Sequence, residues 1–189
     1  AYLSLSTKKY GGQAVLVRKT MKKPIVSYNM GSREGHYKSG RFIKLEFRDL
    51  VVSSVYAPFN GAGKPGHHER RRKWDARLKE EIKGQVRARE DRELKGQKKG
   101  GKARILLGDL NVVNRDSDIT GNPAFWKKQG DQTVEEGDRG FGGTTSNERS
   151  RFQNILDEGD MADTFTAPLD SSTQEQWTFR GEGKFLGKG

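Results

Sequence analysis

The stretch Ile105-Leu106-Leu107-Gly108-Asp109-Leu110-Asn111-Val112-Val113 decides how the rest of the chain is interpreted. Its apolar start is typical of a buried β-strand, and the strand ends in an acid and an amide two residues apart. In extended backbone, residues i and i+2 face the same way, so Asp109 and Asn111 are expected to project together while Leu110 turns towards the core. A carboxylate can ligate a hard cation or accept a proton from water, and an amide can donate to a phosphoryl oxygen. The pair suits phosphate-ester hydrolysis, although an isolated Asp-x-Asn is more often a turn or a helix cap.

The composition limits the classes of protein to consider. The chain has 189 residues, of which 31% are hydrophobic and none is cysteine, and its mean hydropathy is −0.93. This length favours one domain with a thin core, and the lack of cysteine excludes disulfides and thiolate chemistry. No apolar run is long enough to cross a bilayer, and no signal-peptide pattern follows Ala1, so we expect no membrane partner.

The positive charge is concentrated in the first part of the chain. Residues 1–61 carry 11 Lys and Arg against 3 acidic residues, residues 62–104 carry 16 against 7, and residues 105–189 carry 9 against 15. This distribution suits a polyanion held by one surface while an acidic pocket binds a cation. A soluble, charged surface without a partner is the alternative interpretation.

Hydrophobic periodicity predicts a mixture of strands and helices. Strands are expected at 13–18, 41–47 and 50–56 and in the Ile105 stretch, with a tight turn at 48–49 that makes an antiparallel hairpin. Two helices are expected. The first has an apolar stripe at steps of four, made by Trp74, Leu78, Ile82 and Val86. The second starts with a capping box of Thr145 and Glu148 and ends at Gly159. We therefore predict an α/β sandwich rather than a doubly wound sheet.

Two further features concern the loops. Residues 87–102 lose the apolar stripe and are rich in Lys, Arg and Gly, which predicts a mobile basic insertion. No Gly-x-Gly-x-x-Gly or Gly-x-x-x-x-Gly-Lys-Ser/Thr pattern is present, so no nucleotide cofactor is expected. His67 and His68 lie beside a Gly/Pro loop, and we expect them to be solvated.

Segments along nearly the whole chain resemble one family. Four of them carry the resemblance most strongly: Gly40-Arg41, Val55-Tyr56-Ala57-Pro58-Phe59-Asn60, Arg72-Lys73-Trp74-Asp75 and Gly108-Asp109-Leu110-Asn111-Val112. Four more continue it: Asp118-Ile119 with Asn122-Pro123, Thr144-Thr145-Ser146-Asn147-Glu148-Arg149, Ala162-Asp163-Thr164-Phe165 and Trp177-Thr178-Phe179. In this order they resemble the exonuclease III/AP endonuclease branch of the endonuclease/exonuclease/phosphatase superfamily. The resemblance implies two packed, mostly antiparallel sheets flanked by helices, the DNase I-like fold, over a single partial domain at 1–189.

The resemblance also implies a metal-dependent site at one end of the sheets. Asp109 would activate or orient the attacking water, Asn111 would bind the scissile phosphate, and both would help to hold Mg²⁺ or Mn²⁺. Tyr56 would donate its hydroxyl to a phosphate oxygen. Because Tyr56 and Asp109 each end a predicted strand, neighbouring strands could bring them together; a rim residue is the alternative for a tyrosine in such a place.

Other candidate substrate-binding residues have structural alternatives. Arg41 resembles a contact to the DNA backbone, although an arginine at a strand start is more often solvated. Asn60 resembles an amide that contacts the phosphate or Tyr56, although a loop-capping asparagine explains it equally, and the inserted Phe59 shifts its register. Phe165 and Trp177 resemble residues near the pocket for an abasic sugar, or are core aromatics. Trp126, in a long polar loop, could stack on a base or sugar, or anchor the loop.

We expect this chain to be an internal fragment lacking both ends of the family pattern. In that pattern a metal-binding Glu precedes the Gln13 region, and an Arg-x-Asp-Tyr segment and Ser-Asp-His close the domain. We expect the Glu to lie before Ala1 and the closing segments after Gly189, so the fragment alone would be nearly inactive. The parent protein is expected to be a monomer that cuts duplex DNA at abasic sites and trims 3′ ends in base excision repair, inside the cell and in the nucleus if eukaryotic. Three alternatives stay open: relatives that hydrolyse phosphoinositides, sphingomyelin or RNA tails; a retrotransposon endonuclease; and a non-catalytic, basic nucleic-acid-binding module, which predicts salt-sensitive, metal-independent binding.

Overall fold

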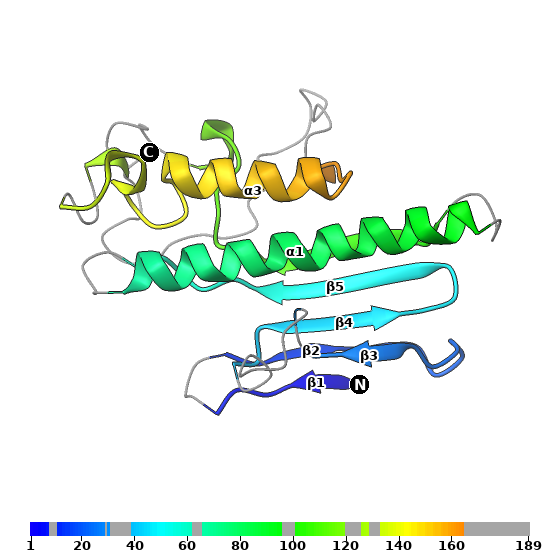
Figure 1. Ribbon diagram of the computed structural model, residues 1–189. Coiled ribbons are helices and arrows are strands. Elements are labelled where there is room, and N and C mark those ends of the chain that lie inside the picture. The colour runs from blue at the N-terminus through cyan, green and yellow to red at the C-terminus, as the bar shows by residue number, and fades with distance from the viewer. Residues whose placement is uncertain are drawn as a thin grey trace, which may run out of the picture.

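In the part of the chain that the structure describes, two β-sheets and two long helices form the fold (Figure 1). The computed structural model describes residues 1–7, 11–28, 30, 39–61, 66–95, 101–119, 126–128 and 133–164. The two-stranded sheet pairs β1 (Tyr2–Ser4) with β2 (Gln13–Val15), and the four-stranded sheet has the order β3 (Ile25–Ser27), β4 (Phe42–Glu46), β5 (Leu50–Tyr56), β6 (Ala103–Asp109). The helices are α1 (His67–Leu94) and α3 (Ser146–Glu158), with short 3-10 turns η1 (Asp116–Asp118) and η2 (Glu136–Asp138). The α/β prediction with two sheets is confirmed.

The four-stranded sheet is mixed. Strands β3, β4 and β5 are antiparallel, and the predicted hairpin closes where the Phe47 N–H donates to the Leu50 carbonyl at 2.8 Å. Strand β6 then pairs in parallel with β5, and α1 makes the connection between them. A parallel pair needs such a crossover, and its consequence is that both strands finish at the same end of the sheet.

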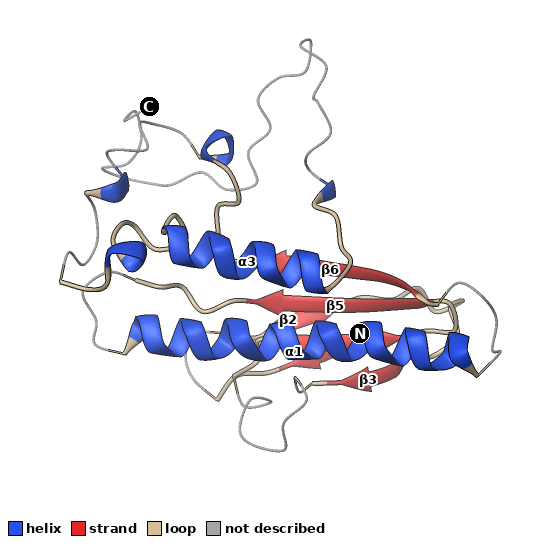
Figure 2. Ribbon diagram, turned by 45° about the horizontal axis from the view of Figure 1, so that its top comes forward, coloured by secondary structure: helices blue, strands red, loops and turns tan. Residues whose placement is uncertain are grey.

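Helix α1 buries its apolar stripe on one face of this sheet. Trp74, Leu78 and Ile82 are buried and pack with Phe42 and Val55. Helix α3 lies beside α1 and adds Ile155 to the same core (Figure 2). The predicted capping box begins α3, because the Glu148 N–H donates to the Thr145 hydroxyl at 3.3 Å.

Two expectations from the sequence were wrong. The helix does not lose its structure at residue 87 but continues to Leu94, because strong helix formers such as Arg, Ala, Glu and Leu sustain a helix without an apolar face. The Arg89 guanidinium also pairs with Asp160 at 3.0 Å; residues 96–100 of the predicted insertion lie outside the described residues. Strand β6, expected to be a buried strand, is only partly buried, since Ile105 and Leu107 are 46% and 43% exposed. It ends the described sheet, and only its other face, with Leu106, packs against the core.

Strand β2 ends at Val15, earlier than predicted, and the three-residue strands β1 and β3 were not predicted. Residues 177–179, one of the segments that resemble the family, lie outside the described residues. Among the helices that the structure describes, none combines the length and apolar character needed to span a membrane.

Candidate active site at the ends of β5 and β6

Strands β5 and β6 bring Tyr56 and Asp109 side by side. The two residues are the last register pair of the parallel ladder, and the Ala57 N–H donates to the Asp109 carbonyl at 2.8 Å. Residues paired in register point to the same face of a sheet, so the phenol and the carboxylate project together. The geometry expected from two neighbouring strand ends is therefore present.

Gly108 allows the two strands to approach this closely. Its φ is +123°, and a Cβ atom added there would overlap the carbonyl oxygen of Val55 on the neighbouring strand. Only glycine combines that backbone angle with so close an approach. The glycine before Asp109 thus has a structural function of its own.

Asn111 meets Asp109 through a turn rather than through extended backbone. Its φ is +46°, and its backbone N–H donates to Oδ1 of Asp109 at 3.0 Å. The side-chain Nδ2 donates to the Ala57 carbonyl at 2.9 Å and to Oδ2 of Asp109 at 3.3 Å. Both partners can only accept, so the amide orientation is fixed and both Nδ2 protons are used. Of the two amide atoms, these bonds leave Oδ1 open, and an amide oxygen can ligate a cation. The roles expected for Asn111, binding the scissile phosphate and helping to hold the metal ion, stay predictions.

Arg41 contacts Tyr56. Its guanidinium carbon lies 4.4 Å from the centre of the Tyr56 ring, and Nη1 donates to the carbonyls of Tyr56 and Ala57 at 2.9 and 3.3 Å. Partial burial lowers the pKa of Arg41, with Tyr56 opposing that shift. A guanidinium held against the face of the ring fixes the orientation of the phenol, so Arg41 positions the Tyr56 side chain.

Arg71 links the two turns of the site, and the sequence interpretation missed it. Its buried guanidinium donates to the carbonyls of Pro58, Asn111 and Leu110 at 3.1, 2.9 and 3.0 Å. Its Nε donates to Asp75 at 2.8 Å. Arg71 precedes Trp74 by three positions and Leu78 by seven, so a cation on the apolar stripe was the available signal.

Buried carboxylates surround this arginine. Asp75 also accepts from Arg151 of α3 at 2.8 Å, and Glu148 lies 4.0 Å from Arg71. Burial raises the pKa of Glu148, and the Arg71 charge and hydrogen bonds from Thr145 and Gly143 oppose that rise. These contacts fix α1 and α3 to the turns that follow β5 and β6.

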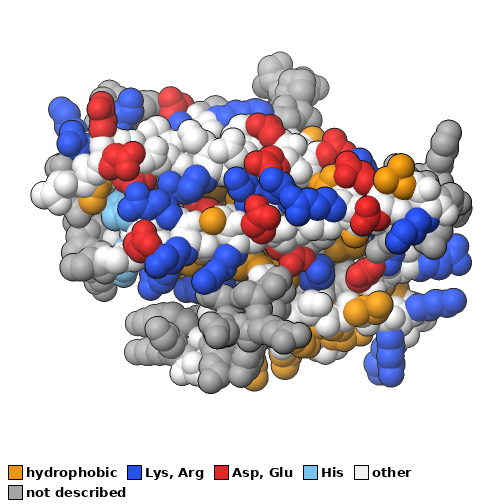
Figure 3. Space-filling model, viewed as in Figure 1, with side chains coloured by type: hydrophobic (Ala, Val, Ile, Leu, Met, Phe, Trp, Pro, Cys, Tyr) orange, Lys and Arg blue, Asp and Glu red, His pale blue; other side chains and the backbone are white. Residues whose placement is uncertain are grey.

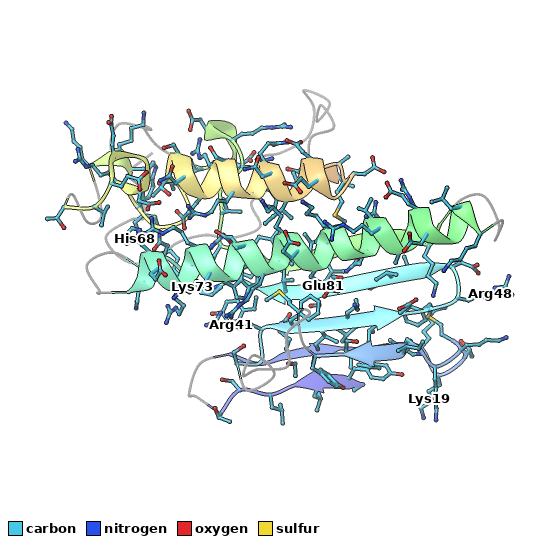
Figure 4. All side chains as sticks on the ribbon, viewed as in Figure 1. Lys19, Arg41, Arg48, His68, Lys73 and Glu81 are labelled. Carbon is cyan, nitrogen blue, oxygen red and sulfur yellow. The ribbon has the colours of Figure 1, made fainter. Side chains whose placement is uncertain are left out.

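Asn60 and His68 occupy the inner side of the β5 turn. Nδ2 of Asn60 lies 3.1 Å from Nδ1 of His68, the Asn60 side chain is buried, and its Oδ1 has no hydrogen-bond partner in the described part of the chain. His68 is half-buried, and His67 Nδ1 lies 3.2 Å from the Gly61 carbonyl, so neither imidazole is simply solvated as expected. His68 and Arg41 lie at the end of the sheet where β5 finishes, and Arg48 lies at the opposite end (Figure 4).

Trp126 packs on Phe141 with ring centroids 5.2 Å apart, and Phe141 packs on Phe59 at 5.7 Å. The loop that carries Phe141 contacts the site, because the Val113 N–H donates to the Gly143 carbonyl at 2.7 Å. Trp126 is thus near the site but is anchored by another ring. Phe165 and Trp177 lie outside the described residues.

Two other features lie away from this site or are incomplete. A cavity of about 630 Å³, lined by residues such as Val51, Gln85 and Arg104, lies at the opposite end of β5 and β6 and takes no part in this geometry. Over the described ranges, no three His, Asp or Glu side chains form a group that could hold a metal ion. Asp109 and Asn111 nevertheless supply oxygen donors, and Mg²⁺ commonly takes one or two carboxylates and fills its shell with water and substrate phosphate.

Comparisons with known proteins find relatives of the chain. No family model matches the chain. It is 33% identical over 167 residues to a DNA-(apurinic or apyrimidinic site) endonuclease of Plasmodium berghei, covering 87% of this chain and 28% of that protein. It is 31% identical to the protein of the same description from Arabidopsis thaliana, covering 98% and 49%. An exodeoxyribonuclease of Streptococcus pneumoniae is 31% identical, with 84% and 47% covered. The chain thus spans less than half the length of these relatives.

Two solved structures share the fold. An AP endonuclease from Archaeoglobus fulgidus superposes with a TM-score of 0.53 at 17% identity. A 3′-5′ exonuclease from Neisseria meningitidis superposes with a TM-score of 0.51 at 22% identity. Each alignment covers 72% of this chain and 43% of the other. The DNase I-like architecture is therefore shared with both nucleases.

Proposed function

This chain belongs to the exonuclease III/AP endonuclease family, and from this we propose that the protein carrying it hydrolyses DNA phosphodiesters at abasic sites and 3′ ends. The observation that carries the proposal is the register pair of Tyr56 and Asp109, with Asn111 folded onto the same carboxylate. A phenol, a carboxylate and an amide oxygen at one sheet end suit attack of water on a phosphate. Base excision repair, in the nucleus of a eukaryotic cell, is the setting that fits this substrate.

We assign the side chains these roles. The Tyr56 hydroxyl donates to a phosphate oxygen, and Arg41 holds the ring in place. Asp109 orients the attacking water and, with Oδ1 of Asn111, is a metal ligand. The family depends on a divalent metal ion, and we propose Mg²⁺, with Mn²⁺ as a substitute. When bound, the ion polarises the phosphoryl oxygen and stabilises the developing charge.

A variant series in the intact gene product tests the proposal. Asp109→Asn, Asn111→Ala and Tyr56→Phe are assayed on a duplex with one abasic site, on the same duplex without it, and with EDTA. We expect each variant to lose about 100-fold or more in rate, the size of one acid–base or electrophilic contribution. We also expect the wild type to prefer the abasic duplex, to lose activity in EDTA and to regain it with Mg²⁺, and to act as a monomer.

Asp116→Asn is the matched control. Asp116 is an exposed carboxylate of η1 that pairs with Arg149 at 2.6 Å, so its loss changes charge by the same amount away from the site. We expect wild-type rates for this variant. Wild-type rates for Asp109→Asn would refute the proposal, and equal cleavage of intact and abasic duplex would favour the retrotransposon-type alternative.

A further inference from the structure

Phe59 is an exposed aromatic ring on a rigid backbone next to the candidate site. Its side chain is 41% exposed, although it lies between two residues whose backbone or side chain is buried. The preceding carbonyl, that of Pro58, accepts from Arg71, and the following residue, Asn60, is bonded to His68. The ring therefore projects from a turn that is fixed on both sides, three residues after Tyr56.

Two further rings support Phe59: Phe141 from the loop after η2, and Trp126 from a segment that precedes η2. We name Phe59, Phe141 and Trp126 the aromatic cluster; its tilted ring pairs have centroid distances of 5.7 and 5.2 Å. Gly142 makes this packing close, because a Cβ atom there would overlap the Asn60 carbonyl oxygen and approach Cε2 of Phe59 to 3.1 Å. Such tilted pairs leave one face of the outermost ring available for another flat group.

The surroundings favour an anionic strand over a neutral apolar ligand. Exposed Lys127 and Lys128 follow Trp126, and exposed Arg70 lies in the first turn of α1, near enough to Arg41 to lower its pKa, though less than burial does. Of the nearby acids, Glu135 and Asp138 both pair with Arg72, at 3.7 and 3.3 Å. Aromatic rings flanked by cations are the usual means of holding unpaired nucleotides.

We propose that the aromatic cluster stacks an unpaired nucleobase next to the phosphodiester held at Tyr56, Asp109 and Asn111. This inference rests on the proposed function and narrows its substrate. The protein would bind a strand end or a gap by stacking Phe59 on a base that has left the duplex. Phe59 makes the stack, Phe141 packs against its ring, and Trp126 packs against Phe141.

Fluorescence of 2-aminopurine tests the proposal with the intact gene product in EDTA, where no cleavage occurs. One duplex carries 2-aminopurine as an unpaired 3′-terminal base, and a second carries it paired in the interior. We expect wild type to quench the unpaired probe and to bind that duplex more tightly. Phe59→Ala and Phe59→Leu should weaken this binding by about tenfold, the loss of one base–aromatic stack, whereas Phe59→Tyr should retain it.

Leu16→Ala, which removes an equally apolar side chain that is 81% exposed, is the matched control and should bind as wild type. If Phe59→Leu binds as tightly as Phe59→Tyr, or if wild type shows no preference for the unpaired end, the proposal is overturned. Hydrolysis of the abasic duplex by wild type is measured separately. If quenching depends on Phe59 but no hydrolysis occurs, the proposed function alone is refuted. If hydrolysis occurs without such quenching, this inference alone is refuted.

Discussion

The Arg71 guanidinium is the side chain on which the site geometry depends most. It donates to backbone carbonyls in the turns after both β5 and β6. Because the side chain is buried, water could not take its place as the donor to these carbonyls. A neutral substitute would leave Asp75 with one cation fewer and several carbonyls without a donor. Removing one partner from a buried pair costs more than the pair contributes in net stability.

We therefore expect Arg71→Met to lower the free energy of unfolding by about 3–5 kcal/mol. Arg71→Lys should recover part of this loss, because a lysine keeps the charge but cannot reach three carbonyls at once. Urea denaturation followed by circular dichroism measures both. Arg87→Met, at an exposed position of the same helix, is the control and should change stability by less than about 0.5 kcal/mol. Equal stability of the Arg71 and Arg87 variants would show that the buried network is dispensable.

Among the strands and helices, glycine has opposite effects in β6 and in α1. Gly108 has a φ of +123° and lies against the Val55 carbonyl, whereas Gly84 is exposed within α1 and has no heavy atom within 4 Å of an added Cβ. At Gly108 the fold requires a residue without a side chain. At Gly84 it does not, and the glycine there only lowers the helix propensity of α1.

Gly84→Ala is accordingly expected to raise the free energy of unfolding by about 0.5–1 kcal/mol. Gly108→Ala should lower it by about 2 kcal/mol or more, because strain at a positive φ adds to the clash between neighbouring strands. Thermal unfolding of the two single variants against wild type gives the comparison. A stabilising Gly108→Ala would mean that β5 and β6 are not in contact at this point.

Patterns that report local burial predicted the elements well. The hairpin of β4 and β5 and the stripe of α1 were predicted because alternation and steps of four map directly onto one covered face. The three-residue strands β1 and β3 carry too few residues for a period, and the exposed face of β6 depends on its position in the sheet.

The same contrast applies to the candidate site. Tyr56 and Asp109 were expected to meet because each ends a strand, and the parallel register places them together. The turn at Asn111 and the bonds of Arg71 were not foreseen, because a positive φ and contacts between distant segments leave no periodic trace. Roles assigned to Arg41 and Asn60 stay predictions, with contacts in the structure that favour positioning.

For the molecule taken together, ion pairs neutralise part of the positive charge that the described residues carry. Lys and Arg side chains gather along α1 with acids among them (Figure 3). Several are paired: Lys73 with Glu69 at 2.9 Å, and both Lys79 and Lys83 with Glu158. A paired cation releases fewer counterions on binding DNA than a free one. Charge alone is therefore a weak basis for the non-catalytic, nucleic-acid-binding alternative.

We expect a shallow salt dependence of duplex binding by the intact gene product without metal, with a slope of log K against log salt no steeper than about −4. Arg70→Ala, which removes an exposed cation, should reduce that slope by about one, and Lys83→Ala should leave it unchanged. Fluorescence anisotropy at several salt concentrations measures this. A much steeper slope that is insensitive to Mg²⁺ would favour the basic binding module.

Strand β6 has a consequence for how the polypeptide behaves when it is produced by itself. It closes the described sheet with Ile105 and Leu107 turned towards solvent. Rims of this kind recruit other extended segments, and an apolar rim recruits them most readily. We therefore expect the isolated polypeptide to associate through β6 into oligomers or fibrils. A lysine introduced at either position would act as a gatekeeper residue that reduces this aggregation.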